Sequence, residues 1–243
     1  MKHNLDALRA EYTEYLDAMF NKYNFGSVLG QGLEPDGAYY DWEQSDDMES
    51  EYDVCFATGA TRFVLIGPNL DYVVKFQDPM DDYDDYGEAE VNTYNAAVVA
   101  GFGDKFTWCA ELMEYQWNEF VIPVYVYEYA QCSPATISDD SYDYHYKNFC
   151  ASKGYDPKTR EAQSRWWREG GECSTSAALV EYAVNVWQFC NELAEEFVAF
   201  LNRNKVNDLH SGNWGYIDGH LVLIDYAGFG KEESRTPIRC NFH

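Results

Sequence analysis

The sequence predicts an α+β fold in which an antiparallel sheet with one main helix precedes a mostly helical part. Three observations predict this class. Short β-branched and aromatic runs separated by turn residues follow one another between residues 54 and 77. Apolar residues at helical spacing dominate the stretch between residues 174 and 201. The pair Asp218-Gly219 then joins two alternating runs, which is a strong local signal for a β-hairpin.

The composition is typical of a folded protein without a membrane segment. The 243 residues are 46% hydrophobic and 17% aromatic, which suffices for one core or for two lobes that share a cleft. We expect no membrane association, because no uncharged apolar run approaches the length of a spanning helix or of a signal-peptide core. Seven scattered cysteines without a Cys-x-x-Cys pair indicate neither a disulfide framework nor a zinc site. They predict reduced thiols and a cytoplasmic location, in the cell that produces or hosts the protein.

The formal charge of −25 restricts the partners. A surface of this sign repels nucleic-acid backbones, so we expect no direct nucleic-acid binding. The acidic residues concentrate between residues 41 and 53 and between residues 78 and 90. Such runs are usually solvated surface, but they also attract a basic protein.

The first 52 residues predict a helix and an acidic loop extension. Residues 4 to 24 carry apolar side chains at spacings of three and four, which is the pattern of an amphipathic helix. Residues 26 to 50 are rich in glycine and acids and show no clear period, so they predict a loop region with room for one short element.

Residues 53 to 130 predict the sheet-bearing part of the chain. Three short strands should form a meander, followed by one helix and two further strands. A proline at position 123 is acceptable only near the start of the last strand. The expected strands are 54–56, 61–66, 72–77, 106–112 and 121–129, and the expected helix is 88–100.

Residues 131 to 243 predict the mostly helical part. Residues 141 to 171 have irregular polarity but contain six of the seventeen basic residues, and we interpret them as charged surface that could also dock an acidic partner. Trp166-Trp167 lie among these basic residues, where packing is favoured over stacking on a ligand. One long helix should follow from the cap candidates Ser174, Thr175 and Ser176 to Leu201.

Oxygen-bearing side chains flank the predicted hairpin. Asn213 enters its first strand and Asp225 leaves its second, so closure of the hairpin should place them side by side. Two neighbouring oxygen ligands suit Mg²⁺, which completes its shell with water and phosphate. Asp208 precedes Asn213 by five residues, and a carboxylate there could accept a proton from an attacking hydroxyl. A polar turn without chemistry is the competing interpretation of the same residues.

This order of residues resembles the protein-kinase-like superfamily, and in particular the serine/threonine kinases of bacteriophages and the aminoglycoside phosphotransferases. The resemblance rests on the segment Asp208-Leu-His-Ser-Gly-Asn213, the hairpin and Asp225. The resemblance implies a bilobal fold, with an N-lobe at 53–130 and a reduced C-lobe at 131–243. It also implies that Asp208 is the catalytic base and that Asn213 and Asp225 bind magnesium.

The upstream half of the chain offers the other parts of a kinase-like site. Lys75 ends an apolar strand sixteen residues after Gly59, as the phosphate-binding lysine should. Lys75 could instead be a charge that protects an edge strand against aggregation, but its apolar neighbours disfavour this alternative. Glu90, with Glu88 as second choice, should hold the Lys75 ammonium. The backbone from Glu128 to Ala130 should bind adenine.

The resemblance therefore implies an ATP- and Mg²⁺-dependent phosphotransferase, most simply a serine/threonine protein kinase with basic protein substrates. The turn Ala57-Thr-Gly59-Ala-Thr-Arg62 keeps only one glycine of the usual loop, and Asp225 is followed by Tyr226-Ala227. A pseudokinase that uses its acidic surface to block a basic host protein stays open as an alternative. A small-molecule kinase of the aminoglycoside type is the other. For His210 we favour a turn histidine that bonds the backbone over a catalytic or metal-binding role.

Overall fold

The computed structural model describes residues 3–23, 42–58, 62–77, 85–132, 139–168, 171–206, 209–227, 237–240 and 242. They belong to two compact units. The first unit comprises Met1–Asn92 and Trp108–Tyr129, and the second comprises Thr93–Thr107 and Ala130–His243. The fold is α+β, and the named strands of both units pair antiparallel.

The first unit is built on a five-stranded sheet with the strand order β1-β2-β3-β5-β4. The predicted meander is confirmed as β1 to β3. The fourth strand begins three residues later than predicted and ends five residues later. A β-bulge between Glu111 and Met113 shifts its register, and the pairing with β5 continues beyond it to Trp117. The strands are β1 Cys55–Thr58, β2 Arg62–Ile66, β3 Tyr72–Gln77, β4 Cys109–Trp117 and β5 Phe120–Glu128.

Pro123 lies inside β5, a strand with neighbours on both sides. A proline there would normally remove a ladder hydrogen bond. The pairing of β5 with β3 ends at Phe76 and Val124, however, so within the described residues Pro123 pairs only with Glu114 of β4. Within the described residues no β3 residue pairs with Pro123, so the proline near the start of the strand removes no hydrogen bond of that ladder.

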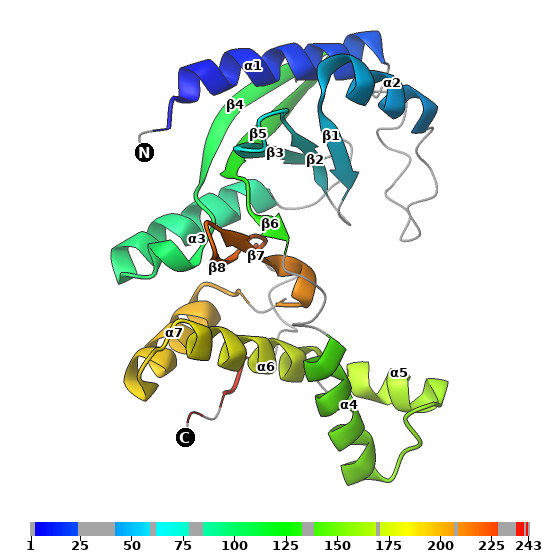
Figure 1. The fold of residues 1–243 in the computed structure, drawn as a ribbon, viewed down its shortest axis with the longest axis vertical. Coiled ribbons are helices and arrows are strands. Elements are labelled where there is room, and N and C mark those ends of the chain that lie inside the picture. Colours follow the sequence, from blue (N-terminus) through cyan, green and yellow to red (C-terminus); the bar gives the residue numbers. More distant parts are fainter. Residues whose placement is uncertain are drawn as a thin grey trace. The chain divides into compact units, whose positions relative to one another are not determined.

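Helix α1 (Leu5–Asp17) lies along one face of this sheet and continues into the π-helical turn Ala18–Lys22 (Figure 1). The predicted amphipathic helix is thus confirmed. Buried side chains of α1 and of this turn share one core with alternate residues of the strands: Leu8, Tyr12, Leu16, Met19 and Phe20 with Phe63, Leu65, Val74, Phe76, Val124 and Val126. Burial of such a stripe stabilises a helix far more than its intrinsic propensity does.

Two side chains of α1 also bind the strand backbone. Arg9 Nε donates to the carbonyl of Leu112 at 2.6 Å, where the bulge interrupts the β4 ladder. The Tyr12 hydroxyl donates to the carbonyl of Tyr72 at 2.9 Å. Helix α2 (Trp42–Tyr52) follows, and it occupies the last part of the region for which we predicted mainly loop.

The second unit contains most of the helices and a small sheet with the order β6-β7-β8. Helix α3 begins in the first unit and ends in the second. The bounds are α3 Tyr86–Ala100, α4 Asp139–Lys153, α5 Arg160–Arg168, α6 Gly171–Val186, α7 Asn191–Arg203, β6 Gln131–Cys132, β7 Trp214–Ile217 and β8 His220–Leu223.

The single long helix predicted from residue 174 to Leu201 is wrong, because the chain breaks between α6 and α7. Gln188 has a left-handed φ of 56°, and the N–H of Phe189 returns to the carbonyl of Val184 at 2.9 Å, as at many helix ends. Trp187 and Phe189 both pack on Phe197 of α7. The apolar stripe therefore crosses the break, and its periodicity does not reveal it. The cap candidates 174–176 lie inside α6.

The segment of irregular polarity, 141–171, is mostly helical. Helices α4 and α5 pack through a small core of Tyr146, Cys150, Ala162 and Trp166. Trp166 is 2% exposed, which confirms the packing interpretation for this residue, whereas the Trp167 side chain lies outside the described residues. The basic side chains of the two helices and their connection whose burial is described are exposed: Lys147, Lys153, Lys158, Arg160 and Arg165.

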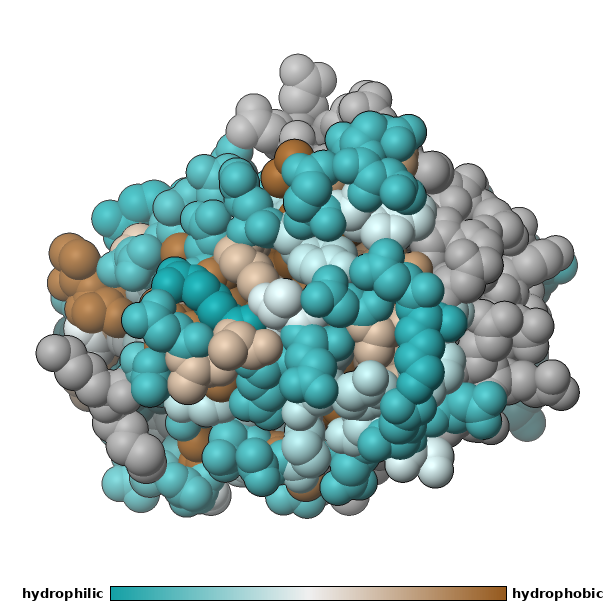
Figure 2. All heavy atoms as spheres, turned by 90° about the horizontal axis from the view of Figure 1, so that it is seen from above, coloured by the Kyte–Doolittle hydropathy of each residue, from teal (hydrophilic) through white to brown (hydrophobic). Residues whose placement is uncertain are grey.

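The face shown in Figure 2 is mostly hydrophilic, and its hydrophobic residues lie in small groups. Within the part of the chain that is described, no helix combines the length and the apolar character that crossing a membrane requires.

Candidate functional site

The predicted site residues are divided between the two units. Lys75, Glu90 and Glu128 belong to the first unit, and Ala130, Asn213 and Asp225 belong to the second. Gly59 and Asp208 lie outside the described residues.

Lys75 lies in β3, as predicted, on the sheet face opposite to α1. Register places it across from Val64 of β2 and Tyr125 of β5. The side chain is 9% exposed, and its Nζ lies 4.4 Å from the centre of the Tyr127 ring. A cation over an aromatic face in a desolvated setting is attracted by the ring quadrupole. The ring of Tyr127 therefore helps to position the lysine.

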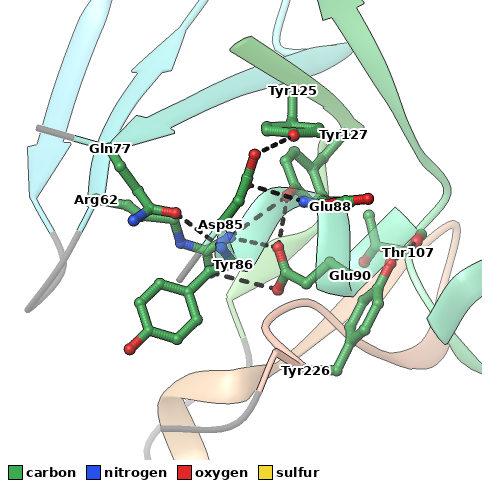
Figure 3. A network of polar contacts seen from close by, with 10 residues as sticks. All are labelled: Arg62, Gln77, Asp85, Tyr86, Glu88, Glu90, Thr107, Tyr125, Tyr127 and Tyr226. Atoms are coloured by element: carbon green, nitrogen blue, oxygen red, sulfur yellow. Dashed lines mark hydrogen bonds and ion pairs between the residues drawn. The ribbon is translucent and has the colours of Figure 1, made fainter. Parts of the chain in front are cut away.

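Glu90 projects from α3 into the same cluster and is fully buried. Its Oε2 pairs with Arg62 Nη1, and its Oε1 accepts from Arg62 Nη2 at 3.3 Å (Figure 3). The Tyr127 hydroxyl donates to Oε2 as well. The sequence predicted Lys75 as the partner of Glu90. The structure shows a bidentate bond to Glu90 from Arg62, and Lys75 acts on this carboxylate through its charge.

The charges in this cluster decide its protonation. Burial alone would raise the pKa of Glu90, but the positive charges of Arg62 and Lys75 and the hydrogen bonds from Arg62 and Tyr127 outweigh it and hold that pKa well below its usual range. Burial, followed by the neighbouring Glu90 charge, raises the pKa of Tyr127 well above its ordinary value. The carboxylate is therefore ionised and the phenol remains a donor.

The first turn of α3 is bound to the sheet at further points. Asp85 caps the helix by accepting from the N–H of Glu88 at 3.0 Å, and it also accepts from the Tyr125 hydroxyl (Figure 3). The N–H of Tyr86 donates to Gln77 Oε1 at 2.7 Å. A Cβ on Gly87 would lie 2.1 Å from the Tyr125 ring, so only glycine permits this close approach. These contacts place Glu90 with little freedom.

The predicted adenine-binding strand is present, but two of its donors are already engaged. The N–H of Glu128 donates to the carbonyl of Trp108 at 3.0 Å, and the N–H of Tyr129 donates to the carbonyl of Asp71 at 2.8 Å. Ala130, in the second unit, is buried. An adenine at this strand would have to use other backbone groups than these two.

The predicted hairpin is confirmed in the second unit. Asp218 and Gly219 have φ of 49° and 80°, which suits a type I′ turn. Trp214 pairs with Leu223, and the N–H of Ile224 donates to the carbonyl of Asn213 at 2.9 Å. Asn213 and Asp225 therefore leave the two strands at the same end, as the sequence predicted.

The end of this hairpin is anchored to the segment before β4. The N–H and the hydroxyl of Thr107 both donate to the carbonyl of Leu223, at 2.8 and 2.9 Å. The buried Tyr226 hydroxyl donates back to the carbonyl of Thr107 at 2.8 Å (Figure 3). These bonds hold the backbone on both sides of Asp225.

The loop before the hairpin is held by its own backbone and by α6. The N–H of Leu209 donates to the hydroxyl of Ser176 at 3.2 Å. His210 accepts twice, at Nδ1 from the N–H of Gly212 at 3.1 Å and at its carbonyl from the N–H of Asn213 at 3.0 Å. Nδ1 as acceptor places the ring proton on Nε2. The interpretation of His210 as a turn residue that bonds the backbone is confirmed.

Asn213 and Asp225 remain the predicted ligands of a metal ion. Amide and carboxylate oxygens are hard ligands, and a pair of them fits Mg²⁺, which keeps several waters. Within the described residues, no three His, Cys, Asp or Glu side chains are grouped so that they could hold a metal.

Two members of the cluster were missed by sequence reasoning. Arg62 and Tyr127 lie on the same sheet face as Lys75, because Arg62 opposes Gln77 and Tyr127 opposes Val73. The alternation along each strand shows which of its residues share a face. The sequence of a single strand does not show the pairing register, which decides which residues of neighbouring strands come together.

Comparison of the chain with protein-family models, with curated proteins and with solved structures finds no match.

Proposed function

We propose that this chain is an ATP- and Mg²⁺-dependent phosphotransferase that acts on a serine or threonine hydroxyl of a protein. The observation that carries the proposal is the hydrogen bond from Ile224 N–H to the Asn213 carbonyl, with Trp214 paired to Leu223. It brings the two predicted magnesium ligands to one end of a hairpin. The burial of Lys75 beside the Glu90 carboxylate supports the proposal independently, since a buried lysine needs a partner or a ligand.

In the proposed reaction the chain contributes positioning and charge. Lys75 opposes the negative charge of the nucleotide phosphates, and Asn213 and Asp225 hold magnesium. Asp208 accepts the proton of the acceptor hydroxyl while the hydroxyl oxygen bonds to the γ-phosphorus and the bond from that phosphorus to the bridging oxygen breaks. ADP leaves with that oxygen. Pre-oriented charges of this kind supply most of the catalysis in phosphoryl transfer.

The acceptor class follows from the charge of the chain. A formal charge of −25 attracts basic proteins and repels polyanions. This attraction extends only over about 8 to 10 Å in physiological salt. We therefore propose a basic protein substrate.

The test is phosphoryl transfer from labelled ATP, with magnesium and a basic protein, by the wild type and by Asp208→Ala and Asp225→Ala. Asp208→Ala should lose at least about 10²-fold in rate, the scale of a lost general base, and Asp225→Ala should also lose transfer because a magnesium ligand is removed. Both variants should keep the thermal midpoint of the folded wild type. Asp71→Ala, at an exposed aspartate, is the matched control and should retain full activity.

Full activity in either variant would refute the assignment. Absence of labelling in the wild type, together with no thermal shift on adding Mg-ATP, would instead favour the acidic binder. Transfer to a small aminoglycoside in place of a protein would favour the small-molecule kinase.

A further inference from the structure

We propose that Arg62 is a positioning residue of the nucleotide site, which holds the Glu90 carboxylate so that Lys75 remains over the ring of Tyr127 and faces the phosphates. This inference rests on the proposed function. It concerns a residue outside the catalytic loop, at the start of the strand that follows the reduced glycine turn.

The placement of Arg62 follows from the sheet register. Arg62 opposes Gln77 and Val64 opposes Lys75, so Arg62 and Lys75 are diagonal neighbours on one face of adjacent strands. Lys75 in turn opposes Tyr125, and Tyr127 is two residues further along the same strand and on the same face. Three strands thus bring Arg62, Lys75 and Tyr127 to one place beneath Glu90.

Arg62 and Lys75 contact different groups of the cluster. Arg62 reaches both oxygens of Glu90, and its Nη1 also lies 3.4 Å from the Tyr127 hydroxyl, which donates to Glu90 (Figure 3). Lys75 meets the same cluster at the face of the Tyr127 ring. Its charge also acts on Glu90 through space, where it lowers the pKa of that carboxyl. Arg62 supplies the bidentate bond.

Arginine is suited to this task and lysine is not. The planar guanidinium matches both oxygens of a carboxylate at once and stays charged when buried. Arg62 is 6% exposed and Glu90 is 0% exposed, so few waters could replace a lost donor. Besides Arg62, Lys75 is the cation among the described residues whose charge acts on Glu90. Without the guanidinium, we expect the ammonium to move to the carboxylate and to leave the position from which it binds phosphate.

The experiment compares Arg62→Met, which removes both the charge and the bidentate guanidinium, with Arg62→Lys, which keeps the charge but not the guanidinium. Initial rates over a range of Mg-ATP concentrations are measured well below the thermal midpoint of each variant. Arg62→Met should raise KM for ATP about tenfold or more and lower kcat, although Arg62 does not touch the nucleotide. Arg62→Lys should fall between Arg62→Met and wild type.

The matched control is Arg160→Met, the same change at an exposed arginine of α5, which should leave KM and kcat at wild-type values. A merely structural role for Arg62 would lower the thermal midpoint and leave both kinetic constants unchanged. Wild-type KM and kcat in Arg62→Met would therefore overturn the inference.

Lys75→Met separates this inference from the proposed function. Loss of transfer in Lys75→Met with wild-type kinetics in Arg62→Met would retain the function and refute the role of Arg62. No transfer by the wild type would refute the proposed function. The interaction between Arg62 and Glu90 would then be tested only by its effect on the unfolding equilibrium. A double-mutant cycle of Arg62→Met and Glu90→Gln should show coupling of at least about tenfold in the unfolding constant; coupling under about threefold would overturn the pair itself.

Discussion

Glu90 shows how one buried residue sets the chemistry of a sheet face. A lone carboxylate at this depth would be neutral, because desolvation of a charge costs several kcal/mol or more. Two cations and one phenol change the balance, and the pKa of Glu90 falls below its usual range. The pair stabilises the fold only while it is complete, since removal of one partner leaves the other buried and charged.

This argument predicts the behaviour of Glu90→Gln. The glutamine keeps the shape of the side chain but removes the carboxylate charge that pairs with Arg62, so the free energy of unfolding at pH 7 should fall by about 3 to 5 kcal/mol. Urea unfolding measures this loss. Glu196→Gln, at an exposed position of α7, should change it by less than about 0.5 kcal/mol.

The same substitution should alter the dependence of stability on pH. The pKa of Glu90 is lower in the folded chain than its ordinary value of 4.5. Its contribution is therefore fully present above about pH 4.5 and is lost as the pH falls toward the folded-state pKa. Unfolding curves between pH 3 and pH 7 should show a shallower acid loss in Glu90→Gln than in wild type. An equal slope would contradict the assignment of Glu90 as an ionised group.

Among single residues, the sequence predicted those site residues that a pattern within a few neighbouring positions indicates. Lys75 was found because it interrupts an apolar strand, and Asn213 and Asp225 because a hairpin must return its ends together. Arg62 was missed, because its partner Glu90 lies 28 residues away and the two meet only after β2 and β3 pair in the observed register.

At the scale of elements, turn chemistry was the most reliable guide. Asp-Gly at 218–219 adopts positive φ at both residues, as a type I′ turn demands. The end of α6 has no such signal, because Gln188 takes a left-handed φ that usually selects glycine or asparagine. Tertiary contacts of Trp187 and Phe189 override the local preference.

The left-handed Gln188 makes a signed prediction. Gln188→Gly should raise the free energy of unfolding by about 1 kcal/mol, because glycine adopts this φ without a Cβ clash. Gln163→Gly makes the same change in the middle of α5 and should lower it by about 1 kcal/mol. Thermal or urea unfolding measures both. If both variants changed the free energy of unfolding in the same direction, the left-handed φ of residue 188 would not be what determines the effect of Gln188→Gly.

At the scale of the whole molecule, the N-terminal helix is part of the first unit and not an appendage. Leu16 is fully buried against the sheet core. The segment that the sequence set apart as an extension therefore supplies one of the two layers of that unit's core.

This predicts that Leu16→Ala lowers the free energy of unfolding by about 2 to 5 kcal/mol, the range for deleting a buried leucine side chain. Leu70→Ala is the matched control, because Leu70 is 52% exposed and its loss should cost little. Urea unfolding followed by tyrosine and tryptophan fluorescence would measure both. Equal, small losses would mean that α1 does not form part of the core.

The sequence by itself determined the amphipathic first helix, the β1 to β3 meander and the closing hairpin, together with the acidic charge. Each of these depends on periodicity or turn chemistry within a few residues, where side-chain direction and backbone φ are set locally. Only the tertiary structure decided the break between α6 and α7 and the joining of Arg62, Glu90 and Tyr127. The physical reason is that these features depend on strand register and on packing between residues distant in the chain, and buried charge selects the register in which every partner is satisfied.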